Sequence, residues 1–98
     1  MVLCSLIGEL RVPEGKKAGM LKEMSKVKEH CPGFRFKENG SLFRISFLGD
    51  QPELKDVCEA VSRRIPAYIG SDATVNVTVG DRLEKLVIAK FPYSGMEP

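Results

Sequence analysis

The residues best suited to chemistry in this chain are cations, and the first pair is Lys16 and Lys17. They lie in the stretch PEGKKAG, where a predicted strand gives way to a predicted helix. Free backbone N–H groups at a helix start attract anions, and two ammonium groups would strengthen that attraction. The same lysines oppose the helix macrodipole, so they can equally be solvated charges offset by Glu14. The pattern indicates a candidate anion site and leaves both interpretations open.

A second group of cations alternates with aromatic residues in a predicted hairpin. If Phe34, Phe36, Phe43, Ile45 and Phe47 point toward a core, then Arg35, Lys37 and Arg44 point to the opposite side of the sheet, because strand side chains alternate. Such a basic face could contact phosphates in RNA. RNA-recognition motifs also stack bases on outward aromatic side chains, and this pattern places none there. RNA or phosphate binding is therefore an alternative function. The simpler interpretation is that this face of the sheet is solvated or covered in a dimer.

No constellation in the sequence identifies a catalytic or metal site. His30 is the one histidine, and the adjacent Cys31 points about 100° away from it on a helix. Cys4, Cys31 and Cys58 are far apart and form no CxxC pair, so we expect three reduced, buried thiols in a cytoplasmic protein. We assign no catalytic residue, no metal and no cofactor, and an enzyme is the function class with the least support.

Composition sets the remaining bounds. The chain has 98 residues, 43% of them hydrophobic and 29% charged, with a net charge of +2. These values are typical of one globular domain, and the charge is too small to indicate nucleic-acid binding by itself. No apolar run approaches the roughly 20 residues that cross a bilayer, so we expect no membrane partner. The apolar N-terminus has no basic leader and is interpreted as a strand.

Hydrophobic spacing predicts five strands and two helices. Period-two alternation indicates strands, the Asn39-Gly40 pair indicates a hairpin turn, and spacings of three and four indicate helices with stripes Ala18, Leu21, Met24, Val27, Cys31 and Leu54, Val57, Cys58, Val61, Ile65. Asp50, Pro52 and Glu53 suit a helix start. The predicted strands are 2–12, 34–37, 41–48, 73–79 and 83–91, and the predicted helices are 15–31 and one that follows Asp50.

This order predicts an α+β fold, a ferredoxin-like βαββαβ sandwich with an additional C-terminal strand and both helices on one face of an antiparallel sheet. The element order resembles that of the acylphosphatases, in which the first loop holds phosphate through an arginine in a Gly-Phe-Arg context. Here that loop has no arginine, and Gly33-Phe34-Arg35 opens the second strand. The resemblance covers element order alone, and we expect no acylphosphatase activity.

The predictions for function and assembly follow from the last strand and the sheet surface. The strand is apolar on both sides, and such a strand should not stay exposed at an edge. We therefore expect a non-enzymatic domain over residues 1–92 with a flexible tail over 93–98. It would bind a protein or a small ligand, as a homodimer formed through the sheet surface or the last strand. The predicted partner surface comprises Leu86, Ile88 and Phe91.

Overall fold

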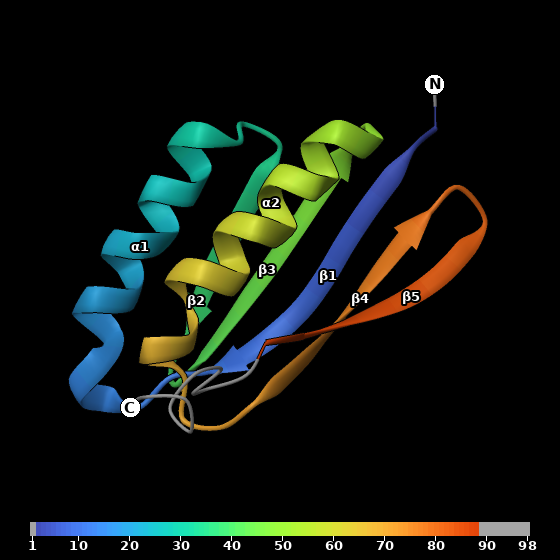
Figure 1. The fold of residues 1–98 in the computed structure, drawn as a ribbon. Coiled ribbons are helices and arrows are strands. Elements are labelled where there is room, and N and C mark those ends of the chain that lie inside the picture. The colour runs from blue at the N-terminus through green and yellow to red at the C-terminus, as the bar shows by residue number, and fades with distance from the viewer. Residues whose placement is uncertain (1, 89–98) are drawn as a thin grey trace, which may run out of the picture.

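Two helices cover one face of a five-stranded antiparallel sheet in the computed structural model, which describes residues 2–88 (Figure 1). The strand order is β2-β3-β1-β4-β5, so the predicted ferredoxin-like arrangement is confirmed and the additional strand extends the sheet beside β4. The elements are β1 (Cys4–Arg11), α1 (Lys17–His30), β2 (Phe34–Asn39), β3 (Leu42–Gly49), α2 (Gln51–Arg64), β4 (Ala73–Val79) and β5 (Arg82–Ile88), with 3₁₀ turns at Glu14–Lys16 and Pro66–Tyr68.

Local sequence signals define the start of α2 and the turns of both hairpins. The Asp50 side chain accepts a hydrogen bond from the Glu53 backbone N–H, and the Glu53 carboxylate accepts one from the Asp50 N–H, both at 2.9 Å. This reciprocal cap satisfies two backbone donors that the first turn of a helix leaves unpaired. Gly40 and Gly80 have φ values of 66° and 64°, the left-handed conformation that tight hairpin turns require. Each hairpin therefore turns where the sequence predicted.

Helix α1 begins without such a cap, and its buried face differs from the predicted one. It follows a short 3₁₀ turn and starts at Lys17, with no side-chain cap and no acidic residue in its first turn. Met20 is fully buried, whereas Ala18 is exposed. The buried stripe is Met20, Met24 and Val27, continued by Cys31, so the predicted stripe was wrong at its first residue. Gly19 lies close to the Tyr68 ring, where a larger residue would collide with it.

The core lies between the helices and the sheet and contains the hairpin aromatics, as predicted. Phe34 and Phe43 are fully buried, and Ile45 and Phe47 are nearly so, while Phe36 packs against the core from its edge. Burying one such side chain contributes about 1.5–3 kcal/mol relative to leaving it exposed. Because the aromatics of β2 and β3 face the helices, Arg35 and Arg44 face the other side of the sheet, where both are exposed.

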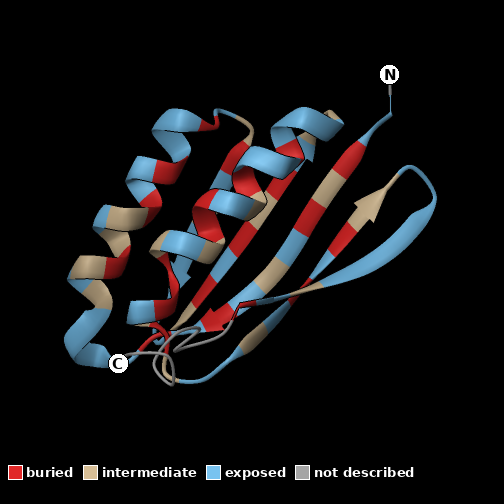
Figure 2. Ribbon diagram, in the orientation of Figure 1, coloured by how far each residue is buried: buried red, intermediate tan, exposed pale blue. Residues whose placement is uncertain are grey.

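The sheet is wider than the pair of helices that covers it. Helix α1 contacts β2, and α2 contacts β3 and β1 and also meets β5. The β4–β5 hairpin extends past α2 toward its turn, and Figure 2 shows that much of this hairpin is exposed. The helix-side face of the hairpin is thus only partly covered.

Some predictions fall outside the described residues. Phe91, the end of the last predicted strand and the tail 93–98 lie there, so the division into a domain and a tail stays a prediction. Within residues 2–88, neither helix has the length and apolar character needed to cross a lipid bilayer.

Candidate functional site

A cleft opens between the first turns of α2 and the β4–β5 hairpin, where the sheet extends past the helix. Its volume is about 620 Å³, which falls within the range of about 300–1,000 Å³ typical of small-molecule sites. Its lining comes from three elements that are distant in sequence: Gln51, Pro52, Leu54, Lys55 and Cys58 of α2, Val77 and Val79 of β4, and Glu84 of β5.

The walls of the cleft are mostly apolar, and its rim carries charge. Leu54 and Val77 are buried at the base, and Val79 is partly exposed. Lys55 and Glu84 are exposed, one on the helix and one on the hairpin, so opposite charges flank the opening. An apolar surface with a few polar groups at its margin is the usual composition of a site that binds an organic molecule.

Cys58 contributes a thiol to this cleft. It is partly buried, in contrast to Cys4 and Cys31, which lie in the core with 1% and 7% of their surface exposed. Burial raises the pKa of the Cys58 thiol above its usual value of 9.0, because an apolar environment disfavours the thiolate. The thiol is therefore neutral near pH 7 and acts as a polarisable part of the wall. The prediction that all three thiols are buried holds for Cys4 and Cys31, and Cys58 departs from it.

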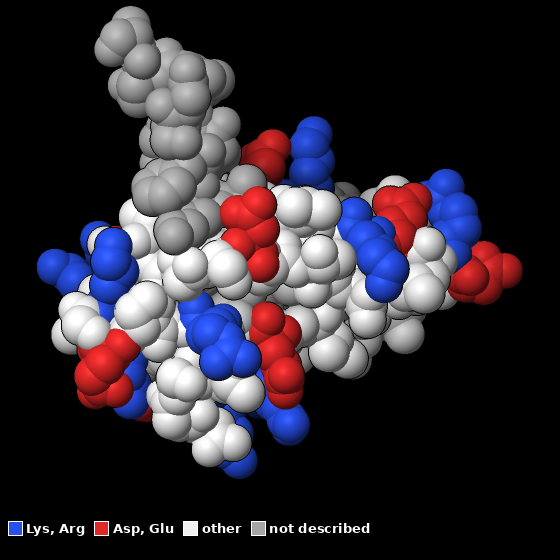
Figure 3. All heavy atoms as spheres, turned by 90° about the horizontal axis from the view of Figure 1, so that it is seen from below, with Lys and Arg blue, Asp and Glu red and all other residues white. Residues whose placement is uncertain are grey.

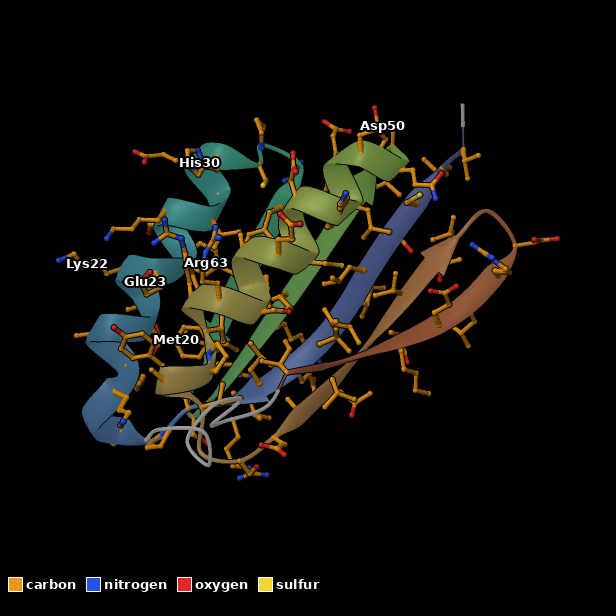
Figure 4. The ribbon with its side chains drawn as sticks, in the orientation of Figure 1. Met20, Lys22, Glu23, His30, Asp50 and Arg63 are labelled. Atoms are coloured by element: carbon orange, nitrogen blue, oxygen red, sulfur yellow. The ribbon has the colours of Figure 1, made fainter. Side chains whose placement is uncertain are left out.

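The reciprocal cap holds the helical wall of the cleft in place. Asp50 lies at the start of α2, beside the residues Gln51 and Pro52 that line the cleft (Figure 4). The cap and Pro52 together limit fraying of the first turn, where helices otherwise lose order most readily. The cleft thus has one wall on a capped helix and the other on a hairpin.

The structure divides the five predicted cations between two separate surfaces. Lys16 Nζ donates a hydrogen bond to the Ala67 carbonyl at 3.0 Å, and Lys17 Nζ pairs with the Glu38 carboxylate at 2.6 Å. Both ammonium groups therefore contact their own chain at the start of α1. Figure 3 shows acidic and basic side chains mixed over the end of the molecule that it presents.

The three hairpin cations lie together on the sheet face away from the helices. Lys37 and Arg44 are direct cross-strand neighbours, and Arg35 precedes Lys37 by two residues on β2. Arg44 Nε lies 2.9 Å from the Glu9 carboxylate, which neutralises part of this group. Within residues 2–88 every phenylalanine points to the helix side, so this face offers no phenylalanine ring on which a nucleobase could stack.

The residues predicted to contact a partner lie elsewhere than expected. Ile88 has 1% of its surface exposed and belongs to the core of its own chain, and Leu86 is partly buried on the same side of β5. Ile88 pairs with Ala73 at the end of the hairpin that meets α2, which explains its burial. The β5 residues that do face solvent on the opposite side are Leu83 and Val87.

Two further chemical groups lie apart from the cleft. His30 is the last residue of α1, exposed at the end of that helix (Figure 4). Glu23 on α1 accepts a hydrogen bond from Arg64 on α2 at 3.1 Å and links the two helices. Among residues 2–88, no three His, Cys, Asp or Glu side chains gather closely enough to hold a metal ion.

Comparison with known proteins yields a match in fold. No protein-family model matches the sequence, and no curated protein matches it significantly. The structure is similar to the crystal structure of a protein from Chloroflexus aurantiacus that is provisionally described as an antibiotic biosynthesis monooxygenase. The TM-score is 0.52 with 18% sequence identity, and the match covers 79% of this chain and 91% of the other. At this identity the match establishes the shared fold.

This match contradicts our prediction of a non-enzymatic binding domain, with an RNA-binding module as its alternative, because the fold is shared with a protein described as an enzyme. The prediction failed for a physical reason. The cleft is built from ordinary apolar side chains that are distant in sequence, and no charged or nucleophilic motif marks it. The one available signal was the two-residue turn at Gly80, which places Val79 and Glu84 on adjacent strands.

Proposed function

We propose that this chain is an enzyme of the monooxygenase type that takes a small, largely apolar organic molecule into the cleft between α2 and the β4–β5 hairpin. The cleft itself carries this proposal, because it combines suitable volume, apolar walls and charged groups at the rim. The match in fold to a protein described as a monooxygenase supports the reaction class.

The side chains of the cleft favour a phenol as the class of substrate. Leu54, Val77 and Val79 would pack against an aromatic ring and exclude water from it. The Lys55 ammonium would stabilise a phenolate oxygen by charge, and the Glu84 carboxylate would accept its proton. An ionised phenol is electron-rich, which makes it the more reactive form toward dioxygen. In this proposal Lys55 and Glu84 set the substrate's protonation state.

The reaction can be tested with isotopically labelled dioxygen. In monooxygenation one oxygen atom enters the substrate and the other leaves as water, with two electrons from the substrate or from an added reductant. The full chain is incubated with a panel of naphthols and polycyclic phenols, with and without a nicotinamide reductant. Mass spectrometry should find one labelled oxygen atom in the product of at least one phenol. A panel without any labelled product would contradict the proposal.

Two variants tie such activity to the cleft. Val79→Trp fills the space beside Leu54 and should abolish product formation. Lys55→Met removes the ammonium group and keeps an unbranched side chain of similar length. It should lower kcat/KM about tenfold or more, as loss of a charged hydrogen-bond donor does. Lys28→Met, at an exposed position of α1, is the matched control, and its kcat/KM should equal that of the wild type. Full activity in Val79→Trp would place the reaction elsewhere.

We also propose a reducing compartment such as the cytoplasm. All three cysteines are free, and two of them lie in the core as unpaired thiols. Structural disulfides are common in oxidising compartments and rare in reducing ones. Fractionation of cells that produce the chain, followed by thiol titration of the recovered protein, tests this location. Recovery of oxidised protein from a secreted fraction would refute it.

A further inference from the structure

A hollow lies on the side of the sheet that carries no helix, near one end of its first three strands. Both helices pack on the other side, so we call this side the open sheet face (Figure 1). The hollow has a volume of about 240 Å³ and shares no lining residue with the cleft beside α2. Its lining includes Ser5 and Ile7 of β1, Arg35 of β2, Ser46 and Leu48 of β3, and Gly33, which adds no side chain.

Strand pairing explains why the surface is hollow at this point. Ser46 pairs with Ile7, and Leu48 pairs with Ser5, so short and long side chains alternate between β3 and β1. Arg35 pairs with Ser46 from the side of β2. Paired residues lie on the same face of a sheet, so these five side chains are neighbours. The serines are half-buried and form the floor, whereas Ile7 and Leu48 are each 61% exposed and stand around it.

The Arg35 guanidinium gives the hollow its charge. Within residues 2–88 this group has no hydrogen bond or ion pair, in contrast to Arg44 on the same face, which pairs with Glu9 at 2.9 Å. A guanidinium presents its N–H donors in a planar fork that fits the two oxygens of a carboxylate. It stays protonated throughout the physiological range of pH. The described part of the chain thus leaves this fork available to a ligand.

The other lining residues match the remaining parts of a small organic acid. The hydroxyl groups of Ser5 and Ser46 can each donate a hydrogen bond to a carboxylate oxygen. Ile7 and Leu48 would cover the apolar part of the acid, which is favourable because it removes apolar surface from water. The volume of about 240 Å³ lies below the range of about 300–1,000 Å³ typical of sites for drug-sized ligands. The acid that fits is therefore small.

A phosphate group suits this composition less well than a carboxylate. A phosphate carries about two negative charges near neutral pH and is usually bound by several cations or by backbone N–H groups. Arg35 is the one cation in the lining of the hollow, because Lys37 and Arg44 lie outside it. Inorganic phosphate would also leave the apolar walls without a partner. The single guanidinium beside apolar walls therefore favours a monocarboxylate.

We propose that this hollow binds a small organic monocarboxylate. The Arg35 guanidinium holds the carboxylate, the two serines donate hydrogen bonds to it, and the apolar group lies between Ile7 and Leu48. The hollow is on the face of the sheet opposite the cleft. This binding is independent of the reaction proposed for the cleft, since its test needs neither a phenol nor dioxygen.

Nuclear magnetic resonance of the isotope-labelled full chain, titrated with benzoate and with hexanoate, tests this site. At least one of the two acids should shift the backbone amides of Ser5, Arg35, Ser46 and Leu48 until the shifts saturate. Benzamide has the shape of benzoate without its charge, and inorganic phosphate has charge without an apolar group. Each should bind at least about tenfold more weakly than the better acid, the effect of losing one hydrogen bond to a charged group.

Three variants assign the binding to the hollow. Arg35→Met should weaken binding of the acid about tenfold or more, because it removes the guanidinium. Ser46→Leu fills the floor and should abolish the saturable shifts. Lys37→Met is the matched control, because it removes a cation from the same strand outside the hollow, and it should change the affinity less than about twofold. Circular dichroism shows whether each variant is folded.

Three results would overturn the proposal. The first is a wild-type chain that gives no saturable shift with either acid, a result that does not depend on how the variants fold. The second is equal binding of the acid by Arg35→Met and Lys37→Met, or binding of benzamide or phosphate as tight as that of the acid. The third is a set of shifts confined to residues 51–58 and 77–79, which would locate the acid in the cleft.

Discussion

Leu83 and Glu84 are consecutive residues of β5 and lie on opposite faces of the sheet. Leu83 pairs with Thr78 on the sheet face away from the helices, the open sheet face, and Glu84 pairs with Val77 on the side that lines the cleft. Near its turn, β4 pairs with β1 over Cys4–Ile7, whereas β5 is the edge strand of the sheet. Leu83 and Glu84 share this edge strand, so contact on the open sheet face and binding in the cleft should be coupled.

This coupling predicts that a change at Leu83 alters substrate affinity in the cleft. Leu83 and Glu84 share one strand, and coupling between two sites is typically about 5- to 150-fold in affinity. Leu83→Lys should therefore bind an active phenol at least about fivefold more weakly, although its side chain never enters the cleft. Isothermal titration of the variant and of Ser25→Lys, which adds the same charge at an exposed position of α1, measures the difference. Equal affinities of the two variants for the phenol would contradict coupling between the two faces of the sheet.

Gly8 should tolerate no side chain, because it faces β4 within the core. A Cβ atom built there would collide with the side chain of Val75, which is β-branched and packed. Gly8→Ala should lower the free energy of unfolding by about 1–3 kcal/mol, the usual cost of overpacking. Gly15→Ala is the control, since nothing lies within 4 Å of the added atom. Urea denaturation compares the two, and similar stabilities would show that β1 and β4 pack more loosely than described.

The cap of α2 should contribute measurably to stability. Asp50→Ala removes the acceptor of the Glu53 N–H and should cost about 1 kcal/mol. Glu59→Ala, at an exposed position in the same helix, should change the free energy of unfolding by less than about 0.5 kcal/mol. Because Gln51 and Pro52 line the cleft, Asp50→Ala should also weaken phenol binding. An Asp50→Ala variant with wild-type stability would contradict the role assigned to this cap.

Alkaline pH should destabilise the chain through its thiols. Burial raises the pKa of Cys58, and burial together with Asp56 and Glu53 raises that of Cys31, both above the usual 9.0. Above that value the unfolded thiols lose protons while the folded ones keep them, so the free energy of unfolding falls as pH rises. The loss should begin near pH 9.0, below the range in which Lys17 titrates.

The pH dependence can be assigned with one variant. Cys58→Ala should show a shallower decline in the free energy of unfolding above pH 9.0, measured by urea denaturation in the presence of a reductant. The Lys17–Glu38 pair adds a separate effect, because hydrogen bonding to Glu38 raises the pKa of Lys17 and its stabilisation is lost only at higher pH. A flat or rising profile from pH 9.0 would contradict the assigned burial of the thiols.

Local signals made most of the fold predictable. The start of α2 was predicted from Asp50, Pro52 and Glu53, and the first hairpin was predicted from the Asn39-Gly40 turn. The predicted strand 73–79 has the same bounds as β4. Helix α1 was harder, because Met20 rather than Ala18 enters the core. Gly19 lies close to Tyr68, which is 49 positions away in the sequence, and no local pattern could reveal that contact.

The candidate site was not predictable for a related reason. Cys58 lies on one wall of the cleft and Val77 and Glu84 lie on the other, and the position of the hairpin relative to α2 is a property of the assembled fold. The same geometry buried Ile88, which the sequence placed on a partner surface, and left Leu83 and Val87 exposed. The sequence showed apolar residues on both faces of β5 and could not tell which face the helices cover.

The cleft is tested most directly by nuclear magnetic resonance of the isotope-labelled chain during titration with a phenol that it oxidises. The account predicts that backbone amide shifts change most in residues 51–58, 77–79 and at Glu84, and that Val79→Trp abolishes these changes. Shifts confined to the open sheet face, or to the start of α1 around Lys16 and Lys17, would contradict it.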